Sequence, residues 1–304
     1  MSPFRGIIPP LVTPLRGPNE LDEGGFCRLI DHVIEGGVHG IFVLGTTGEG
    51  PSLSSELQRK TISVATRHAA DRVPVLVGVT HPSYFESMSL AHHAADCSAA
   101  AVVLAAPYYF PASQDELLGY LSQIVRELPL PVMLYNMPSM TKLVFEPDMV
   151  RTALTWPNCV GLKDSSGDIE YFGKVVEIAQ ARRDFTVLIG PEHLLLDAIA
   201  IGGDGGVHGG ANVFPRQLVS LYLAAINGER TETLQDQLRR LGRMYSIGTN
   251  PASSVIKAIK CALSIKGICE DVMAHPFTAF GPHERQQIEQ IIAGIQERPA
   301  MEIQ

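Results

Sequence analysis

The sequence predicts a (β/α)8 barrel, an α/β fold also called a TIM barrel, followed by a C-terminal segment of three helices. Short apolar segments alternate with amphipathic segments along most of the 304 residues, and eight such pairs are present. No antiparallel hairpin signal separates them. Eight strand–helix units in one chain favour a closed barrel over an open sheet. We expect the barrel to span residues 1–228 and the helical segment residues 229–304.

The expected strands are short and apolar because both faces of a barrel strand are covered. In chain order they cover residues 6–14, 40–44, 73–79, 100–105, 131–135, 158–163, 185–189 and 205–208. The expected helices have apolar residues at three- and four-residue spacing and polar or glycine caps, such as Ser54 and Gly36. They cover residues 21–36, 54–70, 84–96, 114–127, 146–154, 169–181, 194–201 and 217–227, then 231–246, 253–265 and 282–296.

The amino-acid composition and the net charge exclude several classes of function. Hydrophobic residues make up 45% and charged residues 18%, which fits a compact enzyme, and the net charge is −8. Because no basic run occurs, nucleic acid and an anionic membrane surface are not expected partners. The five scattered cysteines are read as reduced thiols. No signal-peptide core or membrane-length apolar run is present, so we expect a soluble, cytoplasmic protein.

Lys163 is the first candidate catalytic residue. It ends a buried strand, and α/β barrels place their reacting groups at the carboxyl ends of the strands. A neutral lysine amine can attack a ketone and form a Schiff base, and desolvation or a nearby cation favours the neutral amine. A solvated lysine that only ends a strand is the alternative.

Other chemical groups follow the remaining strands. They are Thr46 and Thr47, Tyr108 and Tyr109, Tyr135 and Asn136, Gly190 and Glu192, and Val207 and His208. No carboxylate or cysteine lies at ligand spacing from His208, so neither zinc nor magnesium is expected. The glycine-rich run 202–210 is more typical of a densely packed strand than of a phosphate loop.

The segment 45–49 and Tyr135 can each be interpreted in two ways, as part of a reactive site or as a purely structural feature. Residues 45–49 form either a turn between strand and helix or a cradle of amides and hydroxyls for a carboxylate. Tyr135 is either a packing residue or, beside a Schiff-base lysine, a phenol that shuttles protons. Thr46 and a second phenol would keep that proton mobile.

Together these motifs resemble the family of dihydrodipicolinate synthases and N-acetylneuraminate lyases. The resemblance rests on the order and spacing of Gly45-Thr46-Thr47-Gly48-Glu49, Pro107-Tyr108-Tyr109, Tyr135-Asn136-Met137-Pro138, Gly161-Leu162-Lys163-Asp164 and Gly205-Gly206-Val207. It implies an aldolase without a cofactor, in which Lys163 forms a covalent Schiff base with pyruvate or another 2-oxo acid.

The resemblance also implies roles for neighbouring residues and for a second subunit. Tyr135 would be the general acid and base, with Thr46 and Tyr109 completing its relay. Tyr109 would enter from a neighbouring subunit, which implies a homodimer or homotetramer. Thr47, with Thr46 and the backbone of Val207, would hold the keto acid.

The chain departs from the synthase pattern at several positions. Met140 stands where synthases have an arginine that grips the carboxylate of the second substrate, and Lys142 supplies only a point charge. Gly190 and Glu192 belong to an unusual loop, in which Glu192 either binds substrate hydroxyls or is an acidic helix-start residue. Lysine-regulated members have histidines where this chain has serines and Gln58, so feedback by lysine is not expected.

The leading hypothesis is therefore a lyase that makes or breaks a C–C bond between pyruvate and an aldehyde, acting on a hydroxylated, keto-deoxy sugar acid. The alternatives are a dihydrodipicolinate synthase that uses aspartate semialdehyde, a dehydratase of a keto-deoxy sugar acid, and a non-catalytic barrel that binds 2-oxo acids. The sequence alone does not identify the second substrate.

Overall fold

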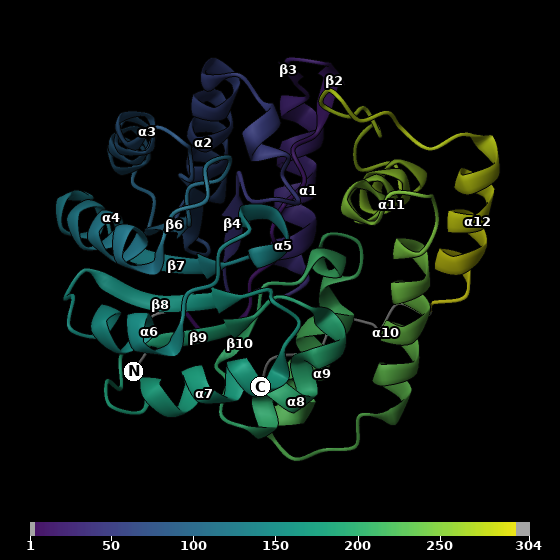
Figure 1. Cartoon of the computed structure of the whole chain (residues 1–304). Coiled ribbons are helices and arrows are strands. Elements are labelled where there is room, and N and C mark those ends of the chain that lie inside the picture. The colour runs from purple at the N-terminus through teal and green to yellow at the C-terminus, as the bar shows by residue number, and fades with distance from the viewer. Residues whose placement is uncertain (1–3, 296–304) are drawn as a thin grey trace.

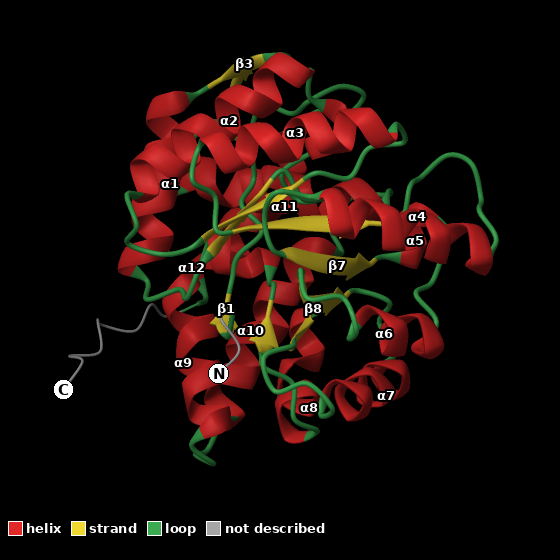
Figure 2. Cartoon of the chain, turned by 90° about the vertical axis from the view of Figure 1, so that its left-hand side faces the viewer, coloured by secondary structure: helices red, strands yellow, loops and turns green. Residues whose placement is uncertain are grey.

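Eight parallel strands surrounded by helices form the centre of the computed structural model, which describes residues 4–295 (Figures 1 and 2). The strands of this sheet are β1 (Gly6–Ile7), β4 (Ile41–Val43), β5 (Val75–Gly78), β6 (Ala101–Ala105), β7 (Val132–Asn136), β8 (Cys159–Asp164), β9 (Thr186–Ile189) and β10 (Gly205–Gly206). They are ordered β1-β10-β9-β8-β7-β6-β5-β4.

The two ends of this sheet meet just beyond β1. Pro10 forms a parallel bridge with Phe42, the Leu11 amide donates to the Phe42 carbonyl at 2.8 Å, and the Phe42 amide donates to the Pro9 carbonyl at 2.9 Å. These bonds join the chain after β1 to β4 and close the sheet into a barrel. The predicted (β/α)8 fold is confirmed.

The helices cover the outside of the barrel, as helices after parallel strands must (Figure 2). Those of the barrel are α1 (Glu23–Glu35), α2 (Ser55–Ala69), α3 (Tyr84–Asp96), α4 (Gln114–Glu127), α6 (Pro147–Ala153), α7 (Ile169–Ala179), α8 (Leu195–Ala200) and α9 (Pro215–Ile226). Ser54 caps α2 by accepting from the Leu57 amide, as expected. Helix α9 starts earlier than predicted because Pro215 occupies its first turn, where a missing N–H has no cost.

Three further helices follow the barrel and lie to one side of it, in green to yellow in Figure 1. They are α10 (Glu232–Tyr245), α11 (Pro251–Ile265) and α12 (Pro282–Ala293). Helix α10 packs against α9, and α11 packs against the short 3-10 turn η3 (Gly209–Asn212). The predicted boundary after residue 228 falls between α9 and α10, and the division into two domains remains a prediction. Residue 296, the expected end of the last helix, lies outside the described residues.

The structure adds elements that the sequence did not predict. A small antiparallel pair joins β2 (Leu15–Gly17) to β3 (Glu20–Leu21), so the expectation of no hairpin was wrong. Its strands are too short to show alternation, and only Pro18 and Asn19 mark its turn. A one-turn helix, α5 (Pro138–Thr141), and the 3-10 turns η1 (Gly50–Ser52) and η2 (Glu192–Leu194) were also missed.

Apolar side chains fill both the barrel and the layer between the barrel and the helices. The interior cluster includes Phe4, Ile8, Phe42, Leu76, Val103, Met133, Tyr135, Leu188 and Val207. Tyr135 and Val207 belong to this cluster and also lie at the carboxyl ends of their strands, so the barrel core itself supports that end. No described helix, within residues 4–295, is both long and apolar enough to cross a membrane.

Candidate active site

Lys163 and Tyr135 face each other at the carboxyl end of the barrel. They are paired neighbours in the register of β7 and β8. The Lys163 Nζ lies 3.8 Å from the centroid of the Tyr135 ring and 5.4 Å from that of Phe42. Only 4% of Lys163 and 7% of Tyr135 is exposed. The amine therefore lies next to two aromatic rings in a largely desolvated position.

The Tyr135 hydroxyl lies at the centre of a hydrogen-bonded group. It is 3.4 Å from the Thr46 Oγ1 and also interacts with the side chains of Ser165 and Lys163. Burial raises the pKa of a phenol, but the Lys163 ammonium and these hydrogen bonds outweigh burial here. The pKa of Tyr135 consequently lies below its ordinary value. A phenol of this kind gives up its proton more readily than a free tyrosine does.

Asn136 and Asp164 fix the ends of the two central strands. The Asn136 amide nitrogen donates to the Asp164 Oδ1 at 2.7 Å, and the Asn136 Oδ1 accepts from the Phe145 amide at 3.1 Å. Asp164 also accepts from the amide and the hydroxyl of Ser166. Burial raises the pKa of Asp164 against these bonds. The strand ends and the loop between residues 137 and 145 are thus held as one unit.

A cavity of about 1080 Å³ opens above this group. Seven of the predicted site residues line it, namely Thr46, Thr47, Tyr135, Lys163, Gly190, Glu192 and Val207. The cavity extends between α8 and α10, where His193, Asp197, Gln235 and Arg239 join its wall. Pyruvate would fill only a small part of this space, which leaves room for a larger second substrate.

The chain matches the dihydrodipicolinate synthetase family over residues 3–295. The chain belongs to this family. A 4-hydroxy-tetrahydrodipicolinate synthase of Phenylobacterium zucineum is 33% identical over 287 residues, 94% of this chain and 95% of the relative. A putative 2-dehydro-3-deoxy-D-gluconate aldolase of Escherichia coli K12, YagE, is 34% identical over 84% of this chain and 85% of its own length.

Solved structures agree with this assignment. A dihydrodipicolinate synthase of Bacteroides thetaiotaomicron has a TM-score of 0.93 and 44% identity, covering 96% of this chain and 99% of that one. YagE, solved in complex with pyruvate, has a TM-score of 0.90 and 30% identity over 96% and 98% of the two chains. Family membership makes this chain an aldolase-type lyase of C–C bonds.

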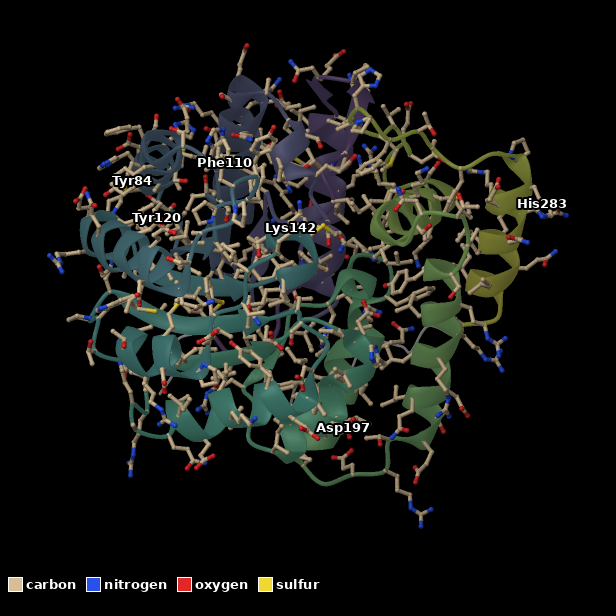
Figure 3. All side chains as sticks on the ribbon, in the orientation of Figure 1. Tyr84, Phe110, Tyr120, Lys142, Asp197 and His283 are labelled. Carbon is tan, nitrogen blue, oxygen red and sulfur yellow. The ribbon has the colours of Figure 1, made fainter. Side chains whose placement is uncertain are left out.

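Tyr109 is the one predicted site residue that does not line the cavity within the described chain. Its side chain is 79% exposed and packs edge to face on Phe110, with ring centroids 5.0 Å apart. Its φ of 94° is uncommon for a residue with a side chain. Within the chain, Tyr108 instead borders a small cavity with Thr46 and Tyr135. In the view of Figure 3, Phe110 lies to the left and His283 of α12 at the right edge of the molecule.

Glu192 lines the cavity but already bonds to the protein. Its Oε1 accepts from the Gly210 amide and from the Tyr245 hydroxyl, the latter at 3.0 Å. Burial raises the pKa of Glu192 against these two bonds. The residue also begins η2, as its structural interpretation required. Glu192 thereby ties the loop after β9 to η3 and α10.

Sequence reasoning missed Ser165, which follows Lys163 by two residues, just after the end of β8, and lines the cavity. That spacing was the available signal. Gly190 makes room for it, since a Cβ at Gly190 would lie 2.0 Å from the Ser165 Oγ. His193, Asp197 and Arg239 were also missed, because only the packing of α8 and α10 brings them to the cavity.

Met140 and Lys142 differ in their relation to the cavity. Met140 lines it and is 41% exposed. Lys142, labelled in Figure 3, is exposed and has a φ of 63° at the end of α5. It is not part of the lining. Among residues 4–295, no group of three or more histidine, cysteine or acidic side chains could hold a metal ion.

Proposed function

We propose that this protein is a pyruvate-dependent aldolase in which Lys163 forms the Schiff base and Tyr135 transfers the protons. The main observation behind this proposal is the position of the buried Lys163 amine, 3.8 Å from the centroid of the Tyr135 ring. The Tyr135 hydroxyl in turn lies next to Thr46. A strand-end lysine in an apolar site is the usual arrangement for attack on a carbonyl. The pyruvate complex of YagE shows that a relative binds this ligand.

The proposed reaction uses only groups of the chain and its substrates. After the Lys163 ammonium has lost a proton, the neutral amine attacks C2 of pyruvate, and the carbinolamine loses water to give an imine. Removal of a methyl proton gives an enamine, whose C3 attacks the aldehyde carbonyl and forms the C–C bond. Water then hydrolyses the imine and releases the product. Tyr135, with a lowered pKa, accepts and returns protons in these steps, and Thr46 relays them.

The proposed second substrate is the aldehyde formed from a hydroxylated 2-oxo acid. Met140, which stands in the sequence where the synthases have an arginine clamp, lines the cavity, and Lys142 is not part of its wall. Besides the ionisable side chains of Glu192, His193, Asp197 and Arg239, the wall offers neutral polar groups. These include Ser139, Ser165 and Gln235, which suit hydroxyl groups. Similarity to the putative 2-dehydro-3-deoxy-D-gluconate aldolase favours the same class.

A dihydrodipicolinate synthase is the second candidate. Its support is the 44% identity to the synthase of Bacteroides thetaiotaomicron. In that case Arg239 of α10, which lines the same cavity, would have to replace the missing arginine clamp. It is 68% exposed and pairs with Asp236, so part of its charge is already engaged.

Borohydride trapping tests the proposal. Incubation with pyruvate and borohydride should add the reduced pyruvyl mass to a peptide that contains Lys163, and Lys163→Met should abolish this adduct. An adduct on exposed Lys142, or none at all, would contradict the mechanism, and a barrel that only binds 2-oxo acids would also give none. A screen of hydroxylated aldehydes against aspartate semialdehyde, followed by loss of pyruvate, then separates the two candidates.

A further inference from the structure

Glu49 and Lys260 form a fully buried ion pair behind the predicted pyruvate loop. Both side chains are 0% exposed, and the Glu49 Oε2 contacts the Lys260 Nζ. Glu49 ends the Gly45–Glu49 motif that carries Thr46 and Thr47, whereas Lys260 belongs to α11. The contact therefore joins a loop of the barrel directly to the C-terminal helices.

Further bonds complete this contact. The Glu49 Oε1 accepts from the Ala274 amide at 2.8 Å, and the Lys260 Nζ donates to the Val272 carbonyl at 2.8 Å. Burial lowers the pKa of Lys260 against the attraction of Glu49. Because a buried ion pair loses its hydration, such a pair stabilises a fold little compared with apolar packing. A contribution to folding stability alone therefore does not explain well why a charged pair occupies this buried position.

The geometry of the loop suggests a stronger reason. Glu49 has a φ of 55°, a left-handed conformation that a side chain disfavours. Its amide donates to the Thr46 carbonyl at 3.1 Å, closing a turn that leads back to the Thr46 hydroxyl and hence to Tyr135. The Thr13 hydroxyl holds the Gly48 carbonyl at 2.7 Å from the other side. Any movement of Glu49 would consequently displace Thr46.

We infer that Glu49 and Lys260 are positioning residues: their ion pair fixes the left-handed turn at Glu49 and so holds Thr46 against Tyr135. Proton transfer at the Schiff-base centre then depends on α11 and on the segment that follows it. The C-terminal helices act as a brace for the loop, although neither Glu49 nor Lys260 touches the cavity. This inference rests on the proposed function of Lys163 and Tyr135.

Four variants test it: Glu49→Gln, Lys260→Met, the double variant, and Lys257→Met as a matched control. Lys257 lies on the same helix, and its Nζ is 5.9 Å from the Phe280 ring centroid, away from the loop. Two quantities are measured for each protein. The borohydride adduct formed at saturating pyruvate counts the competent Lys163 sites, and NMR gives the rate at which pyruvate methyl protons exchange with deuterium.

We expect Glu49→Gln and Lys260→Met to lower exchange per trapped site by about 10- to 100-fold, the cost of a small misplacement of a catalytic group. The double variant should exchange faster than Lys260→Met, because no charge remains unpaired and the introduced glutamine side chain can still accept from the Ala274 amide. Lys257→Met should match the unmodified protein. A merely structural pair would lower trapping and exchange in proportion and leave their ratio unchanged.

Exchange per trapped site within twofold of the unmodified protein in all variants would overturn the inference, as would an equal loss in Lys257→Met. If the single variants fail to fold, the exchange per trapped site of the double variant tests the inference, because that variant has no unpaired buried charge. Absence of both adduct and exchange in the unmodified protein would instead refute the proposed function, and the brace with it.

Discussion

At the scale of single residues, Tyr135 combines two contacts that belong to different parts of the same side chain. Its ring lies beneath the Lys163 amine and excludes water from it, whereas its hydroxyl meets Thr46. A change that removes only the hydroxyl should consequently keep the apolar cover of the amine and remove the group that transfers protons.

Tyr135→Phe makes this change. We expect the pyruvate adduct on Lys163 to form more slowly but to reach its normal final yield, because the ring remains, and turnover to fall by about 10²–10⁴, the usual contribution of a general acid or base. Steady-state kinetics beside borohydride trapping measures both quantities. A kcat within twofold of the unmodified protein would identify Tyr135 as a packing residue.

His208 offers a prediction for the response to acid. Burial lowers its pKa from 6.5 to about 4 against its hydrogen bond with the Gly190 carbonyl, so the folded protein keeps the ring neutral. The unfolded chain takes up this proton below pH 6.5, and the folded protein does so only near pH 4. His208 therefore contributes stability above pH 6.5 that is lost progressively as the pH falls to about 4.

His208→Asn should make the free energy of unfolding less sensitive to acid. The loss between pH 7 and pH 4 should be smaller by about 3 kcal/mol, the value of 2.5 pKa units. Urea unfolding at several pH values measures this difference, and His283→Asn, which removes an exposed ring on α12, serves as the control. Equal pH dependence in all three proteins would show that His208 titrates normally.

At the scale of elements, the loop between β7 and α6 determines where Met140 lies. Helix α5 is a single turn, closed by the Thr141 hydroxyl on the Met137 carbonyl at 3.1 Å. Beyond it, Phe145 is held by Asn136 through its amide and by the Tyr171 hydroxyl through its carbonyl, the latter at 2.6 Å. The loop is fixed at both ends, so a substitution at Met140 should change the cavity wall and leave the barrel intact.

Met140→Arg tests substrate choice on this element. A guanidinium fork restores the charge and the geometry that bind a carboxylate, so kcat/KM with aspartate semialdehyde should rise by about tenfold or more, equivalent to at least 1.4 kcal/mol. Use of the hydroxylated substrate should fall. Lys142→Met, which changes an exposed charge outside the cavity wall, should affect neither reaction.

The activity of the unmodified protein with aspartate semialdehyde tests whether Met140 excludes that substrate. We expect weak or undetectable use of aspartate semialdehyde together with measurable exchange of pyruvate methyl protons. A kcat/KM of about 10⁴ M⁻¹s⁻¹ or above, within the ordinary range of enzymes, would show that the chain is a synthase despite Met140.

At the scale of the whole molecule, Tyr109 raises the question of a second subunit. Its exposure, its strained φ and its contact with exposed Phe110 give it no role inside one chain. Strain of this kind persists where the surroundings hold the residue in place. A neighbouring subunit in a homodimer or homotetramer would supply such surroundings and would bring Tyr109 to the relay of Thr46 and Tyr135.

Subunit mixing tests this placement. Lys163→Met should be inactive and Tyr109→Phe strongly impaired, but hybrids of the two should regain activity. In a hybrid, an intact Lys163 site receives an intact Tyr109 from the other chain. The activity of re-associated mixtures, compared with each variant alone, measures this effect. Mixtures that never exceed the average of their components, or a fully active monomer, would contradict the exchange of Tyr109.

Periodic patterns in the sequence determined the eight strand–helix units and the position of Lys163 and Tyr135. Helix and strand periods are local, and a buried parallel strand brings its last residues to one end of a barrel whatever the loops do. The first candidate residues and the family could therefore be predicted. The β2–β3 hairpin and α5 could not, because they are short and lie outside the continuous apolar runs that mark the buried barrel strands.

Only the tertiary structure decided which distant groups meet. The ion pair of Glu49 with Lys260, the bonds of Glu192 with Gly210 and Tyr245, and the wall contributed by Arg239 all join the barrel to the C-terminal segment. Their positions depend on how helices pack across long stretches of chain, and packing leaves no local pattern at either residue. For the same reason the sequence placed Glu49 in a turn but gave no indication of the helix that holds it there.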